Sequence, residues 1–448
     1  MMPGGILMLK NSMKILLGTA LLLSAALPAF AFEDADPVLA SLVSRAAESS
    51  PIVAAAGART ARAEAAISEA KAKFGPKIGV ATAAIWAEND PLLPAVNPLT
   101  GSLLGVVPAG FRNTYAAAAG FVQTVYAGGS LYANKQAAVL ARDAAAAEES
   151  RVLQSVANSV RVAYYGLRRA EEKELVAKEA LTLSKNHLVR AEKLFKAGVA
   201  AKGDVLRTKV AVAESEMNLI RAQNAAALSI PALERAVGVS LDKKELETPR
   251  RSLPAKAPLY EISPDVQTVA LENRAEIRMY SLLSKQADRV ARAAQGQLLP
   301  QIMAVGALTN VDNEFFPNEN GEWRLGLAAY WTIFDNGEIS ARTRQAKSKA
   351  KELLFMVDDM KNVVKMEATQ AELNLKSAES RLVVAQRRLA EAEEDYRIAV
   401  KRYDANVGTN LDMLDARLSL TNSKTELVDS LYDIETARAN LLFAIGKQ

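Results

Sequence analysis

The sequence predicts an α+β membrane protein made of two tandem copies of one unit, each containing a β-hairpin and a long helix. Two observations carry this prediction. The same pattern recurs at a fixed offset, because Asp204 and Asp412 differ by 412 − 204 = 208 positions, as do Phe195 and Tyr403. Long runs with helical periodicity also alternate with short segments of strand-like alternation, once in each copy.

The N-terminus has the pattern of a secretory signal peptide over residues 1–31. A basic start is followed by the apolar run Ile15–Leu27 and by the small residues Ala29–Ala31. The coding start is either Met1 or Met13, since the segment after Met13 is a sufficient signal by itself. No later run of about 18 residues is apolar. The mature chain is therefore expected to be exported and to enter a membrane, if it does so, with strands.

Composition excludes several classes of function. The chain of 448 residues has 55 basic and 51 acidic residues, a net charge of +4, and no cysteine. The two signs of charge are interspersed, which argues against a nucleic-acid partner. The absence of cysteine excludes disulfides, thiolate metal sites and a lipidated cysteine. With no nucleophile–base pair and no cluster of metal ligands, we expect no catalytic residue, no metal and no cofactor, and the chain is not expected to be an enzyme.

The repeat divides the mature chain into three parts. The first copy covers residues 32–240, a proline-containing linker covers 241–262, and the second copy covers 263–448. Each copy is expected to hold a helix, a hairpin, a long helix and a returning helix. Pro76 matches Pro300 at an offset of 224, so the first copy carries 224 − 208 = 16 extra residues in its hairpin region.

Each copy contains one long helix. The runs Leu131–Lys196 and Ile339–Asp404 each have 66 residues without proline, enough for about 100 Å of helix. Apolar side chains recur in the second run at alternating spacings of three and four, the seam of a coiled coil. The seam residues are Leu375, Ala378, Leu382, Ala385, Leu389, Ala392, Tyr396, Ala399 and Tyr403. Breaks at Lys196–Gly203 and Asp404–Asn410 separate these helices from the returning ones.

Four strands are expected between the helices. They are Lys77–Ala87, Thr114–Tyr126, Gln301–Thr309 and Trp323–Phe334. The last alternates apolar with small or polar residues, as outer-membrane strands do. All three tryptophans, Trp86, Trp323 and Trp331, fall in these strands, and the last two are roughly 26 Å apart on one face. This spacing indicates membrane-interface aromatics, although a soluble β-layer with tryptophans in its core is the alternative.

Four strands cannot close a barrel, and an open edge cannot lie in lipid. The chain is therefore expected to borrow strands from copies of itself. Three copies supply twelve strands for a trimeric outer-membrane β-barrel, which continues into a long coiled-coil α-helical barrel.

The motif "LDMLDA" at Leu411–Ala416, its degenerate copy "GDVLRT" at Gly203–Thr208 and the repeat itself resemble the TolC family of outer-membrane efflux proteins. The resemblance covers essentially the whole mature chain. It implies a homotrimer in the outer membrane of a Gram-negative bacterium, in contact with outer-membrane lipid and with its helices in the periplasm. It also implies a channel of a tripartite efflux pump or type I secretion system, with a periplasmic membrane-fusion adaptor and an inner-membrane transporter as partners.

The resemblance also implies roles for residues at the helix breaks. In the family, an aspartate of the first break bonds a tyrosine and an arginine of the second and holds a periplasmic gate shut. The matching positions are Asp204 and Tyr403, whereas the arginine position holds Gly408, a departure from the family pattern. The paired carboxylates of the family's narrowest point match Asp412 and Asp415.

Simpler interpretations stay open at this stage. Asp204 and Asp412 each begin a helix, where a carboxylate can accept backbone N–H bonds, and Thr409 with Asp412 resembles a capping box. His187, the one histidine of the chain, is expected to be solvated. The rival class is a non-transporting periplasmic coiled-coil structural or adaptor protein, which would not explain one hairpin per repeat.

Overall fold

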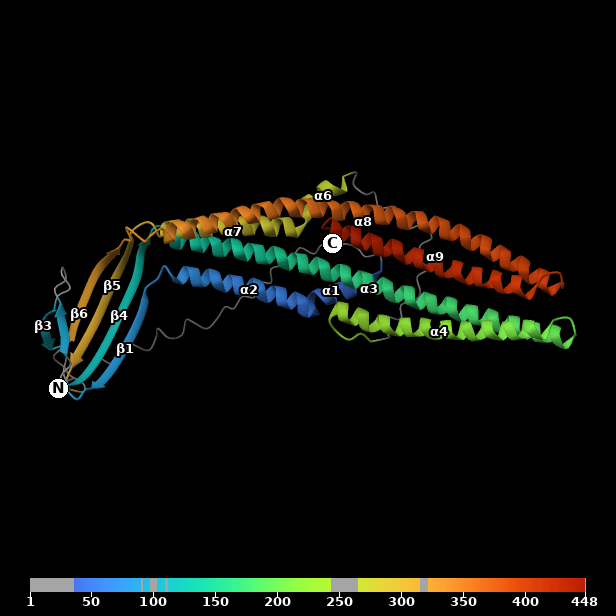
Figure 1. Ribbon diagram of the computed structural model, residues 1–448, viewed down its shortest axis with the longest axis horizontal. Coiled ribbons are helices and arrows are strands. Elements are labelled where there is room, and N and C mark those ends of the chain that lie inside the picture. The colour runs from blue at the N-terminus through green and yellow to red at the C-terminus, as the bar shows by residue number, and fades with distance from the viewer. Residues whose placement is uncertain are drawn as a thin grey trace, which may run out of the picture.

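The protein is a long rod of paired helices with a small sheet at one end (Figure 1). The computed structural model describes residues 36–89, 112–242, 265–314 and 321–447, and the backbone of 92–96 and 103–108. The predicted signal peptide and most of the predicted linker lie outside the described residues. The helices are α1 Pro37–Ser49, α2 Pro51–Ala72, α3 Ser130–Lys196, α4 Lys202–Val237, α6 Val266–Asn273, α7 Ala275–Gly296, α8 Glu338–Asp404 and α9 Asn410–Ala444. None of the helices in the described part of the chain is apolar over a length that could cross a membrane.

The two long helices are confirmed. Helices α3 and α8 each have 67 residues, and each turns back at a break into α4 or α9, which packs antiparallel against it (Figure 1). Every predicted seam position of α8 is buried or half-buried, with Leu375 and Ala378 almost fully so. Alanine at alternate seam positions lets the two backbones approach closely, which is why a chain with few aromatic residues can form such a long hairpin.

The four long strands form one antiparallel sheet in the order β1-β4-β5-β6. Their bounds are β1 Lys77–Trp86, β4 Asn113–Ala127, β5 Gln301–Asp312 and β6 Gly321–Tyr330. The pairing of β4 with β5 joins the hairpins of the two copies into one surface. Strands β1 and β6 are the two edges, and among the described residues each is paired on one side only. A separate pair, β2 Leu92–Val96 and β3 Leu103–Pro108, lies in the longer connection of the first copy.

The prediction that the fourth strand continues to Phe334 is wrong. Strand β6 ends at Tyr330, opposite Gln301. The residue before Gln301 is Pro300, which has no N–H to continue the ladder. The chain then turns towards α8 through Asp335, whose carboxylate accepts the N–H of Gly337 at 2.9 Å and of Ile339 at 2.7 Å.

Two glycines make the junction between the sheet and the helices. Gly128 has a φ of +59°, and a Cβ there would lie 2.0 Å from the carbonyl oxygen of Gly296. Only glycine fits such a positive φ at this close approach. The contact fixes the start of α3 against the end of α7, and so sets the direction in which the sheet leaves the helices.

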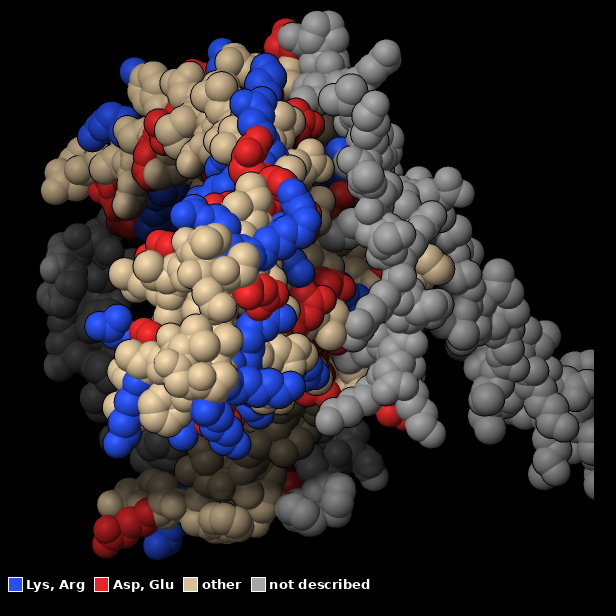
Figure 2. Space-filling view, turned by 90° about the vertical axis from the view of Figure 1, so that its right-hand side faces the viewer, with Lys and Arg blue, Asp and Glu red and all other residues tan. Residues whose placement is uncertain are grey.

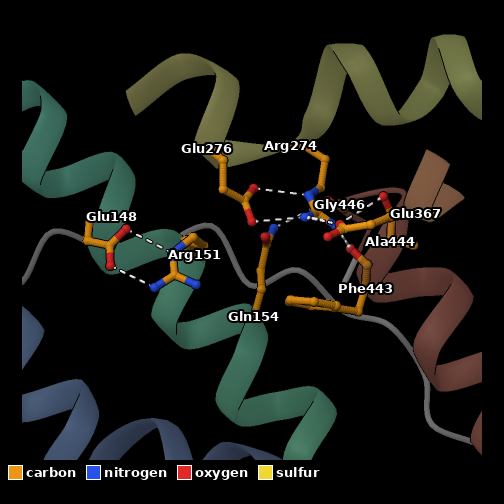
Figure 3. Close-up of polar contacts among 9 residues, drawn as sticks. All are labelled: Glu148, Arg151, Gln154, Arg274, Glu276, Glu367, Phe443, Ala444 and Gly446. Carbon is orange, nitrogen blue, oxygen red and sulfur yellow. Dashed lines mark hydrogen bonds and ion pairs between the residues drawn. The ribbon is translucent and has the colours of Figure 1, made fainter. Parts of the chain in front are cut away.

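A buried arginine organises the middle of the rod, where α9 ends and α7 begins (Figure 3). Arg274 donates two bonds of 3.0 Å to Glu276 and one of 2.7 Å to Glu367 of α8. Its Nη1 also reaches the last carbonyls of α9, those of Phe443 and Ala444, at 3.4 Å each. Orphan carbonyls at a helix end need such donors. Arg274 therefore ties α7, α8 and the end of α9 together.

Candidate functional site

The two helix breaks lie side by side at the end of the rod opposite the sheet (Figure 1). Figure 2 views this end directly and shows basic and acidic side chains interspersed with uncharged surface. The first break is strongly basic: residues 193–209 hold five Lys or Arg and one Asp, a sum of 5 − 1 = +4. The second is slightly acidic, since residues 401–415 hold two basic and three acidic side chains, 2 − 3 = −1. The two breaks of one chain therefore differ in sign.

Asp412 caps the second returning helix, as predicted. Thr409 is the N-cap of α9, its Oγ1 accepts the Asp412 N–H at 3.1 Å, and its own N–H donates to the Asp412 carboxylate at 3.0 Å. This capping box lowers the pKa of Asp412, chiefly through the bond from the Thr409 backbone N–H. Asp204 behaves differently, because α4 has Ala201 at its N-cap and no side-chain capping bond. The predicted capping bond is therefore present for Asp412 and absent for Asp204, which still places its negative charge in the first turn of α4.

Asp412 and Asp415 share an exposed face of α9. Both side chains are exposed, while Met413 and Ala416 on the opposite side are buried. Their three-residue spacing stacks them one turn apart. The capping bonds use one carboxylate oxygen of Asp412, so both residues still present negative charge to the same side of the helix end.

Tyr403 and Asp204 lie near one another without bonding. The Tyr403 hydroxyl is buried and has no hydrogen-bond partner among the described residues. Burial is the main reason why the pKa of Tyr403 is raised, and the negative charge of Asp204 is the second. Within a single chain, the Tyr403 hydroxyl therefore makes no hydrogen bond to the Asp204 carboxylate.

The glycine at the family's arginine position has a steric reason. A Cβ at Gly408 would lie 3.0 Å from the Cβ of Arg402. The Gly408 N–H also donates to the Arg402 carbonyl at 3.0 Å, closing the turn that ends α8. A side chain at this position would meet Arg402 closely and would need a small shift of that residue. The charge of Arg402 acts on Asp412 and contributes to its lowered pKa.

The expectation for His187 is wrong. This side chain is only 2% exposed. Its Nε2 lies 2.8 Å from Oδ1 of Asn410, the first residue of α9, and its ring meets that of Tyr403 edge-on with centroids 5.1 Å apart. Helix α3 packs against both α4 and α9, so it buries a wider stripe than a helix with one partner. His187 lies beside the seam position Leu188, within this wider stripe.

Two residues that the sequence analysis missed complete the interior of this end. Asn410 also accepts from Thr208 Oγ1 at 3.3 Å and donates to the Asp204 carbonyl at 3.3 Å. Arg417 is buried, bonds Ser184 and Ser215, and has no ion pair among the described residues. The sequence pattern that could have identified them is their spacing. Asn410 and Arg417 are seven residues apart, on the face of α9 opposite the two aspartates.

The tryptophans lie at both ends of the sheet. Trp86 ends β1 and Trp323 lies near the start of β6, both at the end far from the helices. Trp331 lies beyond the end of β6, at the helical end, and its indole N–H donates to the Leu298 carbonyl at 3.1 Å. The three side chains are 67%, 75% and 56% exposed, respectively. In the single chain, the tryptophans therefore do not form a buried core of the sheet, which was the alternative interpretation.

These features define a class: a chain in which a sheet of four long strands, with free edges among the described residues, lies at one end of two long helical hairpins. The chain belongs to the family of outer membrane efflux proteins, whose model matches residues 42–239 and 267–447. The predicted class and its outer-membrane location are thereby confirmed over the rival coiled-coil class.

Curated relatives resemble the chain over part of their length. The toluene efflux pump outer membrane protein TtgC of Pseudomonas putida is 24% identical over 64% of this chain and 60% of its own. The alkaline protease secretion protein AprF of Pseudomonas aeruginosa is 22% identical over 63% of this chain and 60% of its own. The chain thus matches about three fifths of the length of these relatives.

Solved structures confirm the fold. The outer membrane protein VceC of Vibrio cholerae superposes with a TM-score of 0.76, at 21% identity, over 91% of this chain and 96% of its own. The outer-membrane channel OprN gives a TM-score of 0.77 at 20% identity, over 92% and 91%. The predicted combination of a four-stranded sheet per chain with long helical hairpins is therefore correct.

Proposed function

We propose that three copies of the chain form an outer-membrane channel that receives substrates from an inner-membrane transporter and a periplasmic adaptor. The observation that carries this proposal is the sheet, which has one unpaired edge at β1 and another at β6. Backbone groups at an open edge cannot stay unpaired in lipid. Three sheets joined edge to edge give a closed barrel of twelve strands, and the helices below it continue as a tunnel.

The exposed residues of the sheet and helices support this assembly. Large apolar side chains such as Val80, Leu325 and Leu327 are more than two-thirds exposed in the single chain, as lipid-facing residues of a barrel would be. The opposite charge of the two helix breaks also favours rings in which first and second breaks alternate. One relative is named for toluene efflux and the other for protease secretion, so the cargo is left to the partner transporter.

Assembly provides the first test. Mass measurement of the purified protein in mild detergent is expected to give three chains, since each sheet edge needs a partner. The same preparation should form conducting pores in planar lipid bilayers. A monodisperse monomer that keeps its β-sheet circular dichroism signal would contradict the proposed channel.

Tyr403 provides a test of the proposed gate. In the assembled channel its buried hydroxyl would find its partner at the neighbouring break, with Asp204 as the candidate acceptor. Tyr403→Phe keeps the ring and removes that bond, which contributes about 1 kcal/mol. The closed channel is therefore expected to conduct a few-fold better in bilayer recordings.

The control for this prediction is Tyr396→Phe, which changes the other tyrosine of the same seam. It should leave the conductance as it is. Should the double variant Asp204→Ala with Tyr403→Phe conduct like the unchanged protein, these residues do not hold a gate.

A further inference from the structure

Two buried polar clusters hold the second hairpin, α8–α9, against the first, α3–α4. The Asn410 cluster consists of Asn410, His187 and Thr208, and the Arg417 cluster consists of Arg417, Ser184 and Ser215. Each takes one residue from α9, one from α3 and one from α4. The clusters are two turns apart, because 417 − 410 = 7 and 215 − 208 = 7. All six side chains are at least nine-tenths buried.

The hydrogen bonds of the Asn410 cluster fix the state of His187. The Asn410 Nδ2 donates to the Asp204 carbonyl, so its Oδ1 is the atom that faces His187 and Thr208. An amide oxygen can only accept, and His187 Nε2 must therefore carry the proton. The other ring nitrogen, Nδ1, is bare, buried and without a partner among the described residues. A second proton would have to be placed on this atom.

The charges around His187 oppose that second proton. The positive charges of Arg417, buried on α9, and of Arg190 on α3 both lower the pKa of the ring. From α8, the negative charge of Asp404 favours the second proton, but this carboxylate is paired with Arg190 at 3.1 Å. Tyr403, also from α8, contacts the imidazole through its ring. From α4, the cluster receives the Thr208 hydroxyl and, through Asn410, the Asp204 carbonyl. Burial and the two cations thus keep the imidazole neutral.

We propose that His187 is a proton-sensitive latch that fastens the second hairpin to the first and loosens when the ring is protonated. The inference rests on the proposed function, in which these hairpin ends surround the entrance of the channel. An imidazolium at this position keeps its bond to Asn410, but it places an unpaired N–H inside the protein and adds a positive charge that the charge of Arg417 opposes. Parting of the two hairpins gives the charged ring access to water.

The direction of the pH effect follows from linkage. Burial lowers the pKa of His187 in the fastened state, whereas an exposed imidazole has a pKa of about 6.5. The fastened state therefore keeps its full stability above about pH 6.5 and loses stability as the pH falls below that value. A difference of one unit between the two states would change the ratio of loosened to fastened hairpins by up to about tenfold.

The first experiment titrates the ring itself. His187 is the only histidine, so the full-length protein with isotope-labelled histidine and no histidine tag gives one imidazole signal by NMR. The matched control is His187→Gln with Asn186→His, which moves the single histidine to the neighbouring exposed position. We expect the native signal to titrate well below that of the control and to report the tautomer protonated at Nε2. Equal titration of the two would overturn the latch, and this result does not depend on whether the protein conducts.

The second experiment measures conductance of the trimer in bilayers between about pH 7.5 and pH 5. The native channel is expected to open as the pH falls. His187→Gln retains an N–H donor for Asn410 but cannot be charged, so it should lose this response while keeping its conductance at neutral pH. Asn410→Asp places a carboxylate against the ring, which should raise the pKa of His187 and reverse the sign of the response.

A pH response in His187→Gln that equals the native one would assign the effect to another group and reject the latch. An unchanged sign in Asn410→Asp would reject it as well. A protein that forms no pores at all would contradict the proposed channel, and the NMR titration would then decide the latch independently.

Discussion

Replacing both Asp412 and Asp415 with alanine is expected to abolish block of the channel by multivalent cations from the periplasmic side. In the proposed trimer these residues would form two rings of three carboxylates, about 4.5 Å apart along the helix axis. Both side chains are exposed on one face of α9, and carboxylate oxygens at a narrow mouth attract and hold multivalent cations. The measurement is the conductance of single channels with increasing concentrations of such a cation on that side.

Single variants separate the two aspartates. Asp415→Ala should weaken the block and leave folding unaffected, because the carboxylate has no bond among the described residues. Asp412→Ala should weaken the block and also fray the start of α9, because it removes one half of the capping box. Asp395→Ala, which removes an exposed acid from α8, is the control and should be blocked normally. A double variant that is blocked at the native concentration would leave Asp412 as a helix cap only.

The pH dependence of this block follows from the capping box. The pKa of Asp412 is lowered by the Thr409 N–H, so its charge, and the stability that it gives to α9, are present above the ordinary aspartate value of about 3.9. Both are lost as the pH falls through the lowered pKa. The capping box therefore opposes loss of the Asp412 charge at the mildly acidic pH at which the His187 latch responds, and the His187→Gln variant separates the two effects in one titration.

The second large effect is expected at Arg274. The variant Arg274→Met leaves Glu276, whose side chain is 12% exposed, as a buried carboxylate without its partner. It also removes the donor that reaches the last carbonyls of α9. Breaking one side of a buried ion pair costs about 3 to 5 kcal/mol. The midpoint for urea unfolding of the detergent-solubilised protein should fall accordingly.

Two comparison variants make the Arg274 prediction specific. Arg278→Met changes an exposed arginine of the same helix and should leave the midpoint nearly unchanged. Arg274→Met with Glu276→Leu removes both buried charges, and Glu367, at 40% side-chain exposure, can be solvated. This double variant should recover part of the lost stability. Equal midpoints for Arg274→Met and Arg278→Met would contradict the organising role of Arg274.

Much of the architecture could be predicted because its signals are local or repeated. The extents of α3 and α8 follow from proline-free runs with a continuous seam. Their ends follow from the breaks that recur 208 positions apart. The end of β6 was missed because it depends on a residue outside that strand. This residue is Pro300, which immediately precedes the partner strand β5. The capping box at Thr409 was visible, since both of its residues lie within one helical turn.

The interior of the hairpin end depends on contacts that no local pattern reports. His187 is flanked by polar residues, and its burial results from α9 packing on α3, with a bond to a residue 223 positions away. Arg417 is likewise buried by helices that precede it by some two hundred residues. The duplicated unit, the long helices, the breaks and the class of protein follow from periodicity and repetition, which are patterns of the residues alone. Which polar side chains lose water follows from the packing of the second hairpin on the first, because desolvation depends on contacts between distant segments.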